Sequence, residues 1–478
     1  MLKLMKPAAL ALVALGLFAA AGPTAAQIAN GDFEAGLQGW RPQPAAGYEI
    51  VTLPTAGSGQ ALRVAWTAGQ PPPARAFAAA AQVFDATPYR GRQVTVSFRA
   101  RALRPGEQIG LALRVDRPPG GARGFFDNMA DRPIRAPEWR TYEVRGFVAP
   151  DAVRVYAGLL VAGAGAAEFD DVRATFSDAP PGAEALAYLS GALQLLRQHH
   201  YRSTQADWTA IGAEARAAAV GAQTPADTYP AIRLAIAALG ERHTFLATPQ
   251  VAQGQGPEAA MPDVSRDGAV GIARLPGLRN AAGDPHGIAA RYTTTLATGI
   301  AEQDKAGACG WLIYLREDTG GNMWPMLGGL DALLGPPPFG WFVMPDGRAS
   351  AWTRIDGRPA SGPPGPAPGA PGPRQSADRP IAVLLGPRTG SSGEMTAMAL
   401  IGRERVRTFG QPTAGLSTPN SSFPLSDGAR LVVTTGKARD RTGFQYEGRI
   451  QPDETVALDA AEAAALRWLS EQGCKAAS

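Results

Sequence analysis

The chain has 478 residues, of which 45% are hydrophobic and 18% charged, so it has the composition of a globular protein too long for one typical core, and two or three domains are expected. Its formal net charge is only +4, it contains no dense Lys/Arg cluster, and these features exclude the nucleic-acid-binding class. Its four histidines and two cysteines lack metal-ligand spacing, so neither a metal nor a cofactor is expected.

Residues 1–26 have the pattern of a secretory signal. Lys3 and Lys6 form a positive start, an apolar run of 14 residues covers 8–21, and small residues at 24–26 precede a predicted cut ahead of Gln27. The run is too short to span a bilayer, and no later stretch reaches about 18 apolar residues. The mature chain is therefore expected to be periplasmic or extracellular, without a transmembrane segment and with a net charge of +2.

An exported protein meets an oxidising compartment, which permits a disulfide between Cys309 and Cys474. Cys309 also lies just before an apolar run that is predicted to be a strand. A buried free thiol is therefore an equally good expectation, and the sequence leaves the pairing open.

Residues 27–177 are predicted to form an all-β domain. Segments such as 93–98 and 153–159 alternate apolar and polar residues with period two, and Gly- and Pro-rich turns separate them. This pattern is typical of a sandwich or jelly roll. Three aromatic residues, Trp40, Trp139 and Tyr142, have the look of exposed side chains, but such aromatics are more often part of the core than a binding platform, so no binding residue is named in this domain.

The two ends of this domain carry recognisable phrases. It opens with Asn30-Gly31-Asp32-Phe33-Glu34 and then Gly39-Trp40, and it closes with Glu168-Phe169-Asp170-Asp171-Val172. These ends resemble those of carbohydrate-binding-module-like jelly rolls. The resemblance implies the fold and suggests a glycan or cell-wall ligand as a partner, although many such domains only position a neighbour.

Helical patterns follow a linker at 178–182, and residues 183–255 are predicted to be a helical part of the next unit. Leucines at helical spacing mark 183–199, a second helix is expected at 207–219, and a third at 224–239. Thr224 is the expected cap of the third helix and Pro225 lies in its first turn.

Residues 256–478 alternate predicted strands and helices, which indicates an α/β core. The expected strands are 269–273, 311–315, 381–385, 406–409 and 431–435, and the expected helices are 289–302, 323–334, 394–402 and 460–472. The Pro/Gly/Ala-rich stretch 359–373 is predicted to be a flexible surface insertion.

Ser391 lies in the segment that indicates chemistry most clearly. It comes after the predicted strand 381–385 and before the predicted helix 394–402. A serine at such a corner lies beside unpaired backbone N–H groups and the positive end of a helix dipole. Enzymes place hydroxyl nucleophiles and oxyanion donors there. The alternative is a turn that only caps an ordinary helix.

A second strand–turn–helix corner carries Gly320 and Gly321. Glycine permits left-handed φ and close approach, so its N–H group can point at a ligand oxygen. The N–H groups of Gly320 and Ser392 are the predicted oxyanion hole. A tight turn that simply needs glycine explains the motif equally well.

His243 and Glu447 complete the candidate set. His243 follows the predicted helix end at Gly240, and Glu447 lies in a turn near the end of the chain. A serine, a histidine and an acid together form the arrangement in which imidazole takes the serine proton and the carboxylate orients the imidazole. Taken alone, the histidine is more often a capping or surface residue, and the glutamate is equally well a solvated carboxylate.

Five phrases in order resemble the C-terminal-processing (tail-specific) serine peptidases, in particular their tricorn-core-like branch. They are the histidine phrase at 240–244, the strand phrase at 314–321, Thr389-x-Ser391-x-x-Glu394, Gly410-x-x-Thr413-x-Gly415, and the closing phrase at 447–453. The resemblance implies that Ser391 is the nucleophile, that His243 is its base and that Glu447 orients the histidine. It also implies a crotonase-like stack of ββα units, and a secreted or periplasmic serine peptidase acting on a polypeptide or peptide.

Four positions depart from the family pattern. Leu416 stands where the Ser–Lys branch has its lysine, Arg242 replaces a serine of the tricorn core, and Tyr314 and Asp318 replace an Asp and an Asn of the strand phrase. Two alternatives therefore stay open. One is a catalytically inactive peptidase fold that binds a glycan or peptide, and the other is a Ser–Lys peptidase that uses Lys437.

Overall fold

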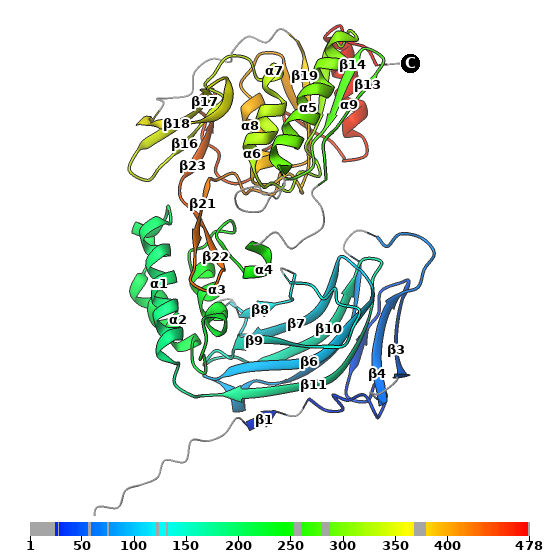
Figure 1. Ribbon diagram of the computed structural model, residues 1–478, viewed down its shortest axis with the longest axis vertical. Coiled ribbons are helices and arrows are strands. Elements are labelled where there is room, and N and C mark those ends of the chain that lie inside the picture. Colours follow the sequence, from blue (N-terminus) through cyan, green and yellow to red (C-terminus); the bar gives the residue numbers. More distant parts are fainter. Residues whose placement is uncertain are drawn as a thin grey trace, which may run out of the picture. The chain divides into compact units, whose positions relative to one another are not determined.

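The computed structural model describes residues 24–26, 28–55, 59–73, 76–120, 124–130, 132–252, 260–278, 287–367 and 379–476 (Figure 1). These residues group into two compact units. The first takes in the chain up to Asn128, with Ile134–Gly182 and Val220–Ala222; the second takes in Met129–Pro133, Ala183–Ala219 and Gln223–Ser478. Most of the predicted signal segment, residues 1–23, lies outside the described residues.

The first unit contains two antiparallel sheets. Their strands are β1 Thr24–Ala26, β2 Arg41–Gln43, β3 Tyr48–Thr55, β4 Gly59–Trp66, β5 Phe77–Asp85, β6 Gln93–Arg104, β7 Gln108–Asp116, β8 Phe125–Asp127, β9 Arg140–Phe147, β10 Arg154–Ala162 and β11 Ala166–Ser177. One sheet has the order β3-β4-β11-β6-β9, with β1 added beside β11, and the other has the order β2-β5-β10-β7-β8.

Strand β6 shows why this sequence forms a sandwich. Val94, Val96 and Phe98 are buried, whereas Ser97 and Arg99 between and beyond them are only partly buried. A strand with one face in the core and one toward solvent alternates in this way. The all-β sandwich predicted for this part of the chain is confirmed.

Of the two possibilities for Trp40, the core is the one found. The indole is 4% exposed, lies 5.0 Å from the ring of Phe33 and donates from Nε1 to the carbonyl of Asn30. The opening phrase therefore packs into the core instead of offering a platform. Trp139 is half-buried, with the guanidinium groups of Arg99 and Arg101 about 5 Å from its ring centre, and Tyr142 is likewise half-buried.

Helices open the second unit, as predicted. They are α1 Ala183–His199, α2 Trp208–Ala218 and α3 Tyr229–Ala238. The Asp207 carboxylate caps α2 by accepting from the N–H groups of Thr209 and Ala210. The predicted third helix begins as a short 3₁₀ turn, Pro225–Thr228, before it becomes α3.

A six-stranded sheet forms the core of the second unit. Its order is β13-β14-β15-β19-β20-β24, and it is parallel from β14 onward. The strands are β13 Asp263–Asp267, β14 Val270–Arg274, β15 Gly310–Tyr314, β19 Ile381–Leu385, β20 Val406–Gly410 and β24 Glu454–Thr455. The helices are α4 Pro249–Ala252, α5 Ile288–Lys305, α6 Met323–Gly329, α7 Asp331–Leu334, α8 Ser392–Leu400 and α9 Ala461–Glu471.

Alternate residues of the central strands enter two separate cores. Ile313 and Val383 pack in one cluster with side chains of α5, α6 and α8, whereas Leu312 and Leu384 pack in another with side chains of α9. Because both faces of the parallel sheet are covered, its strands appear in the sequence as continuous apolar runs. The predicted α/β core is confirmed, and its repeated strand–helix units agree with the expected crotonase-like fold.

Two smaller sheets complete the second unit. One has the order β12-β22-β21 and the other β18-β17-β16-β23. The strands are β12 Phe245–Ala247, β16 Gly340–Val343, β17 Arg348–Ile355, β18 Arg358–Pro366, β21 Asn420–Pro424, β22 Arg430–Thr434 and β23 Lys437–Asp440.

Strand β18 corrects the prediction of a flexible insertion at 359–373. Its residues form an edge strand that pairs antiparallel with β17, where proline's missing N–H group can face away from the partner. The remainder of the predicted insertion, from residue 368, lies outside the described residues.

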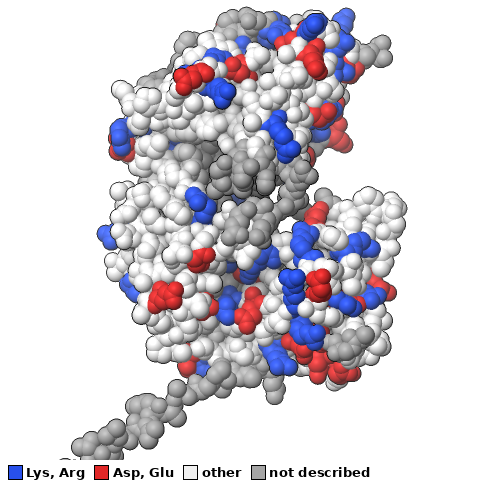
Figure 2. Space-filling model, viewed as in Figure 1, with Lys and Arg blue, Asp and Glu red and all other residues white. Residues whose placement is uncertain are grey.

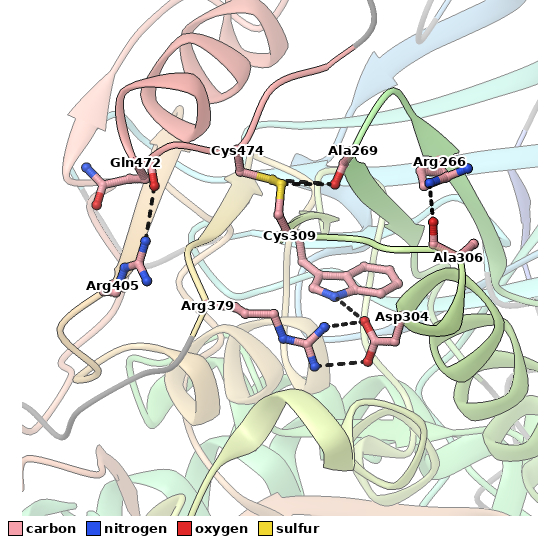
Figure 3. The surroundings of a disulfide bond; sticks show 10 residues. Arg266, Ala269, Asp304, Ala306, Cys309, Arg379, Arg405, Gln472 and Cys474 are labelled. Carbon is pink, nitrogen blue, oxygen red and sulfur yellow. Dashed lines mark hydrogen bonds and ion pairs between the residues drawn. A yellow bond between two sulfur atoms is a disulfide. The ribbon is translucent and has the colours of Figure 1, made fainter.

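Cys309 and Cys474 form a disulfide, with their Cα atoms 5.5 Å apart. Figure 3 shows it beside the carbonyl of Ala269, close to the ion pair between Arg379 and Asp304. The bond ties the residue before β15 to the segment after α9. Of the two expectations left open by the sequence, the disulfide is the one found.

The surface is mixed in charge. Figure 2 shows Lys and Arg side chains interspersed with Asp and Glu on the visible face. Many of the ion pairs join well-exposed groups, for example Arg140 with Glu138 and Arg348 with Asp346. Such exposed pairs contribute only about 0–1 kcal/mol each, so burial of apolar side chains within each unit supplies most of the stability.

Candidate active site

Ser391 lies at a sharp corner between β19 and α8. Its backbone has φ +53° and ψ −117°, a conformation that costs a residue with a Cβ atom about 1–3 kcal/mol. Thr389 stabilises the preceding turn, since its hydroxyl donates to the Leu315 carbonyl (2.7 Å) and accepts from Gly386 N–H (3.0 Å). The corner therefore holds the Ser391 hydroxyl in place.

Glu394 holds this corner from inside the protein. Its buried carboxylate accepts from the N–H groups of Ser391 (3.0 Å), Gly415 (2.9 Å) and Leu416 (2.7 Å), and also from the hydroxyl of Thr413. Burial raises the pKa of Glu394, although these hydrogen bonds oppose the shift. One carboxylate thus ties the Ser391 turn to the loop at 413–416.

His243 lies directly beside Ser391. Its Nε2 is 3.0 Å from Ser391 Oγ, and its Nδ1 is 2.8 Å from Thr418 Oγ1. The residue is 7% exposed, and burial lowers the pKa of His243 to about 4, with the charge of Glu241 acting in the opposite direction. The imidazole is therefore neutral at pH 7. With its proton on Nδ1, directed at Thr418, Nε2 is free to accept the Ser391 hydroxyl proton.

Glu241 is the carboxylate nearest in sequence to this histidine. It accepts from the backbone N–H groups of His243 (2.5 Å) and Thr244 (2.8 Å), and His200 Nε2 lies 3.4 Å away. Burial alone would raise the pKa of Glu241, but the bonds from His200, Thr244 and the backbone outweigh it and lower the pKa to about 2. A negative charge is therefore fixed next to the His243 backbone.

The structure does not bring Glu447 to the imidazole. Its side chain is 67% exposed and bonds to Lys437 Nζ at 2.6 Å, which lowers the pKa of Glu447. The position expected for the acid, at His243 Nδ1, is taken by the hydroxyl of Thr418. Lys437 is therefore bound to Glu447, whereas the hydroxyl of Ser391 is hydrogen-bonded to His243. This arrangement favours the histidine over the lysine as the base.

The glycine corner packs tightly against the serine. A Cβ atom at Gly320 would lie 2.6 Å from Ser391 Cβ, and Gly320 has φ +100°, so only glycine fits there. Its N–H group, predicted to face the oxyanion, instead donates to Asp318 Oδ1 at 2.9 Å. Among the described residues, the N–H groups of Ser392 and Gly321 have no hydrogen-bond partner.

Asp318 lies fully buried behind this corner. Its Oδ2 atom has no hydrogen-bond partner among the described residues, and burial raises the pKa of Asp318 to about 7, opposed by the bond from Gly320. This residue stands where the family phrase has Asn. Below about pH 7 the Asp318 carboxyl is therefore mostly neutral, like the Asn side chain that the family phrase has at this position.

Comparison with known proteins identifies the part of the chain that contains Ser391, Glu394 and Thr418, while His243 lies outside the matched range. Residues 270–456 match the profile of peptidase family S41. This part of the chain is an S41 peptidase domain. The chain is 26% identical over 253 residues to the nisin-resistance protein of Lactococcus lactis subsp. lactis, which covers 52% of this chain and 76% of that protein.

Two further similarities agree with the S41 assignment. The carboxyl-terminal-processing protease of Synechocystis is 28% identical over 202 residues, 42% of this chain and 41% of that protein. The structure of a lipoprotein from Streptococcus agalactiae, 24% identical, superposes with a TM-score of 0.51 over 60% of this chain and 97% of that chain. These relatives support a serine-type peptidase, and the structure supports the fold.

Three residues of the candidate site were not predicted from the sequence. Thr418 gives no signal in the sequence, because a threonine in a loop has many roles. Glu394 belongs to the nucleophile phrase, and its place three residues after a serine at a helix start is the pattern of a capping box. Glu241 stands two residues before His243, so a search for buried carboxylates near the histidine would have found it.

Neither metal nor membrane features emerge from the described residues. No group of three or more His, Cys, Asp or Glu side chains there is arranged to hold a metal ion. Within the same residues, no helix has both the length and the apolarity needed to span a membrane.

Proposed function

We propose that the chain is an exported serine peptidase in which Ser391 is the nucleophile and His243 the general base. The observation that carries the proposal is the 3.0 Å contact between Ser391 Oγ and a buried, neutral His243 Nε2. Contact at this distance lets a base take the hydroxyl proton as the serine attacks.

The steps follow from this pair. Ser391 Oγ bonds to the carbonyl carbon of the scissile peptide while its proton passes to His243 Nε2. The resulting oxyanion is stabilised by the N–H group of Ser392 and by the Gly320–Gly321 turn, where Gly321 N–H has no other described partner. The imidazolium then protonates the leaving amine as the C–N bond breaks. Water, deprotonated by the same imidazole, hydrolyses the acyl-enzyme.

Thr418 takes the orienting position in this proposal. Its hydroxyl accepts from Nδ1–H and so leaves Nε2 unprotonated and facing Ser391. The fixed charge of Glu241, rather than that of Glu447, favours the imidazolium as it forms. Glu447 has other partners and receives no role in the chemistry.

Active-site labelling tests the proposal. A serine-reactive phosphonate should label Ser391 in the wild-type chain, and Ser391→Ala should abolish both labelling and hydrolysis of unfolded protein. Unchanged hydrolysis by Ser391→Ala would remove this serine from the mechanism. His243→Ala should lower kcat by about 10²–10⁴-fold, whereas Lys437→Ala should retain activity. The reverse result would establish the Ser–Lys alternative.

Export is a proposal that rests on the residue pattern at 1–26. Expression of the full chain should release a mature protein that begins at Gln27, as read by amino-terminal sequencing. A protein that keeps residues 1–26 and stays in the cytoplasm would contradict it.

For the first unit we propose glycan binding, on one observation. On the sheet that contains β7, β8 and β10, Phe126, Arg114 and Tyr156 form a paired row across the strands, with Phe126 57% exposed and Arg114 over the Tyr156 ring. Exposed aromatic rings can stack on sugars. A pull-down on insoluble polysaccharide or cell wall tests this proposal. The wild-type chain should be retained, and the double variant Phe126→Ala with Tyr156→Ala should not. If the wild-type chain is not retained, the unit would have only a positioning role.

A further inference from the structure

Strand β21 is the outer strand of the small sheet beside the candidate site, and its backbone register is fixed. Among the described residues it pairs only with β22. Thr435 N–H donates to the Pro419 carbonyl (3.0 Å), and Leu425 N–H donates to the Ala429 carbonyl (2.9 Å). In an antiparallel pair such bonds recur at every second residue. The odd-numbered residues of this strand therefore face β22.

The even-numbered residues of β21 turn their backbone groups to the free side. These are Asn420, Ser422 and Pro424. Among the described residues, the N–H groups of Asn420 and Ser422 and the Asn420 carbonyl have no partner, whereas the Ser422 carbonyl accepts from Arg430 (3.1 Å). Ser422 and Pro424 are exposed. An open strand edge of this kind accepts another extended chain by backbone pairing.

This open edge begins at the catalytic pair. The Asn420 side chain donates to the His243 carbonyl at 2.9 Å, and Thr418, two residues before the strand, contacts the imidazole. His243 and Asn420 thus lie at the same end of the three-stranded sheet. One end of a chain paired along β21 would therefore lie near Ser391 and His243.

At its other end the edge reaches a groove. A groove of about 540 Å³ is lined by Leu195 and Gln198 of α1, by Pro424 at the end of β21 and by Leu425 and Ser426 after it. The ring of His199, the last residue of α1, stacks on Phe423 of β21 at 4.3 Å. Figure 1 shows α1 beside the hairpin of β21 and β22. The groove therefore begins at Pro424, where the edge of β21 ends.

We propose that β21 is the substrate-binding strand of this peptidase, and that an extended polypeptide pairs through its backbone with Asn420 and Ser422 and continues into the groove beside α1. This inference rests on the proposed peptidase function. A polypeptide is the fitting occupant because the unmet groups are backbone donors and acceptors at strand spacing, starting at the catalytic pair.

The proposal defines a substrate class. Backbone pairing does not depend on side-chain identity, and Glu184 is the one charged side chain that lines the groove within the described residues. Substrates are therefore chosen for being unfolded and extended. Because a strand rises about 3.3 Å per residue, Asn420 to Pro424 span about 13 Å. A substrate needs at least about four residues on that side of the cleaved bond to reach the groove.

Substitution of Ser422 by proline tests the pairing. Proline removes the outward N–H group and is tolerated on strand edges. With an unstructured twelve-residue fluorogenic peptide of Ala, Ser, Gly and Leu, Ser422→Pro should raise KM about tenfold and leave kcat within about twofold. The matched control is Ser421→Ala, whose backbone faces β22, and its KM should equal that of the wild-type chain. An unchanged KM in Ser422→Pro would overturn the inference.

Modified peptides give a second test that needs no mutation. In a series of the same peptide with one N-methyl group moved along the chain, KM should rise at alternate positions, because only every second peptide N–H faces β21. Uniform sensitivity, or none, would overturn the pairing.

Phosphonate labelling of Ser391 separates the two levels of failure. If the wild-type chain is labelled and cleaves the peptide but both tests above are negative, only the role of β21 fails. If the wild-type chain is neither labelled nor active, the peptidase proposal itself fails.

Discussion

The serine side and the histidine side of the candidate site are built differently. Ser391 follows a fully buried strand and starts a fully buried helix, and the carboxylate of Glu394 fixes its turn from within. His243 lies on a short loop before β12, and its ring is held by Thr418, 175 residues away in the chain. The serine side depends on the core and on local capping, whereas the histidine side depends on long-range polar contacts.

This difference indicates where the site is rigid and where it can be tuned. Changes on the serine side should affect folding and activity together. Changes on the histidine side should alter rate and pH dependence with little effect on stability, because the small sheet contributes little to the two cores. Four predictions test this contrast.

The largest effect is expected from Glu394→Ala. Loss of the buried carboxylate leaves the partly buried N–H groups of Ser391, Gly415 and Leu416 without this acceptor, and a fully buried group left unsatisfied costs about 1–3 kcal/mol. Calorimetry should show a fall in stability of several kcal/mol, about 2–5, and kcat should fall at least about 100-fold. Glu394→Gln, which keeps an acceptor oxygen, should recover part of both. Wild-type stability of the alanine variant would contradict the assigned role.

Thr418→Val should act on the rate alone. The isosteric valine removes the acceptor for Nδ1–H, so the imidazole no longer has a fixed tautomer, and kcat should fall about 10-fold. The melting temperature should stay within about 2 °C of the wild-type value. A joint loss of stability and activity would remove the distinction between the two sides.

The acid limb of activity reports the environment of His243. The base must be neutral, so activity should be lost as pH falls through about 4, the lowered pKa of His243. The charge of Glu241 raises that pKa, and Glu241→Gln should therefore move the limb to still lower pH and reduce kcat about fivefold. A pH–rate profile of kcat/KM measures both. A midpoint near 6.5 in the wild-type chain would contradict the burial of the base.

The smallest effect is expected from Asp318→Asn, and it appears as pH rises through about 7. The pKa of Asp318, raised to about 7, means that the carboxyl ionises as pH rises through 7 and places a negative charge one hydrogen bond from Gly320. The charge opposes the oxyanion, and kcat should fall a fewfold between pH 6 and 8. The asparagine side chain cannot ionise, so in the Asp318→Asn variant the fall in kcat should begin at a higher pH. Identical profiles would show that Asp318 does not titrate in this range.

The sequence predicts the serine side well and the histidine side only in part. The strand 381–385, the turn and the helix after Ser391 are consecutive in the chain, so periodicity and capping rules locate them. His243 was found through the resemblance of its phrase, but Thr418 and Asn420 reach it only through the pairing of β21 with β22. Spacing along the chain carries no information about such contacts.

Glu447 illustrates the same limit from the opposite direction. Its phrase matches the family, yet its carboxylate bonds to Lys437, ten residues earlier on β23. The Glu447 carboxylate therefore forms a local ion pair with Lys437 and does not contact the histidine. Strand β18 differs from expectation for a similar reason, because pairing with a neighbouring strand decides where a proline-rich segment is ordered. Packing likewise decides that the ring of Trp40 is covered, which the sequence had left open.

The disulfide separates the two residues of the proposed catalytic pair. The covalent ring closed by Cys309 and Cys474 spans 165 residues of separation and contains Ser391 and Thr418, but His243 lies outside it. Closing a ring of that size disfavours the unfolded chain by about 5 kcal/mol in the chain-entropy account. Oxidation would therefore consolidate the half of the molecule that carries the nucleophile, while the histidine loop joins it through non-covalent contacts alone. In the export that we propose, a newly made, reduced chain would be easier to keep unfolded than the oxidised chain.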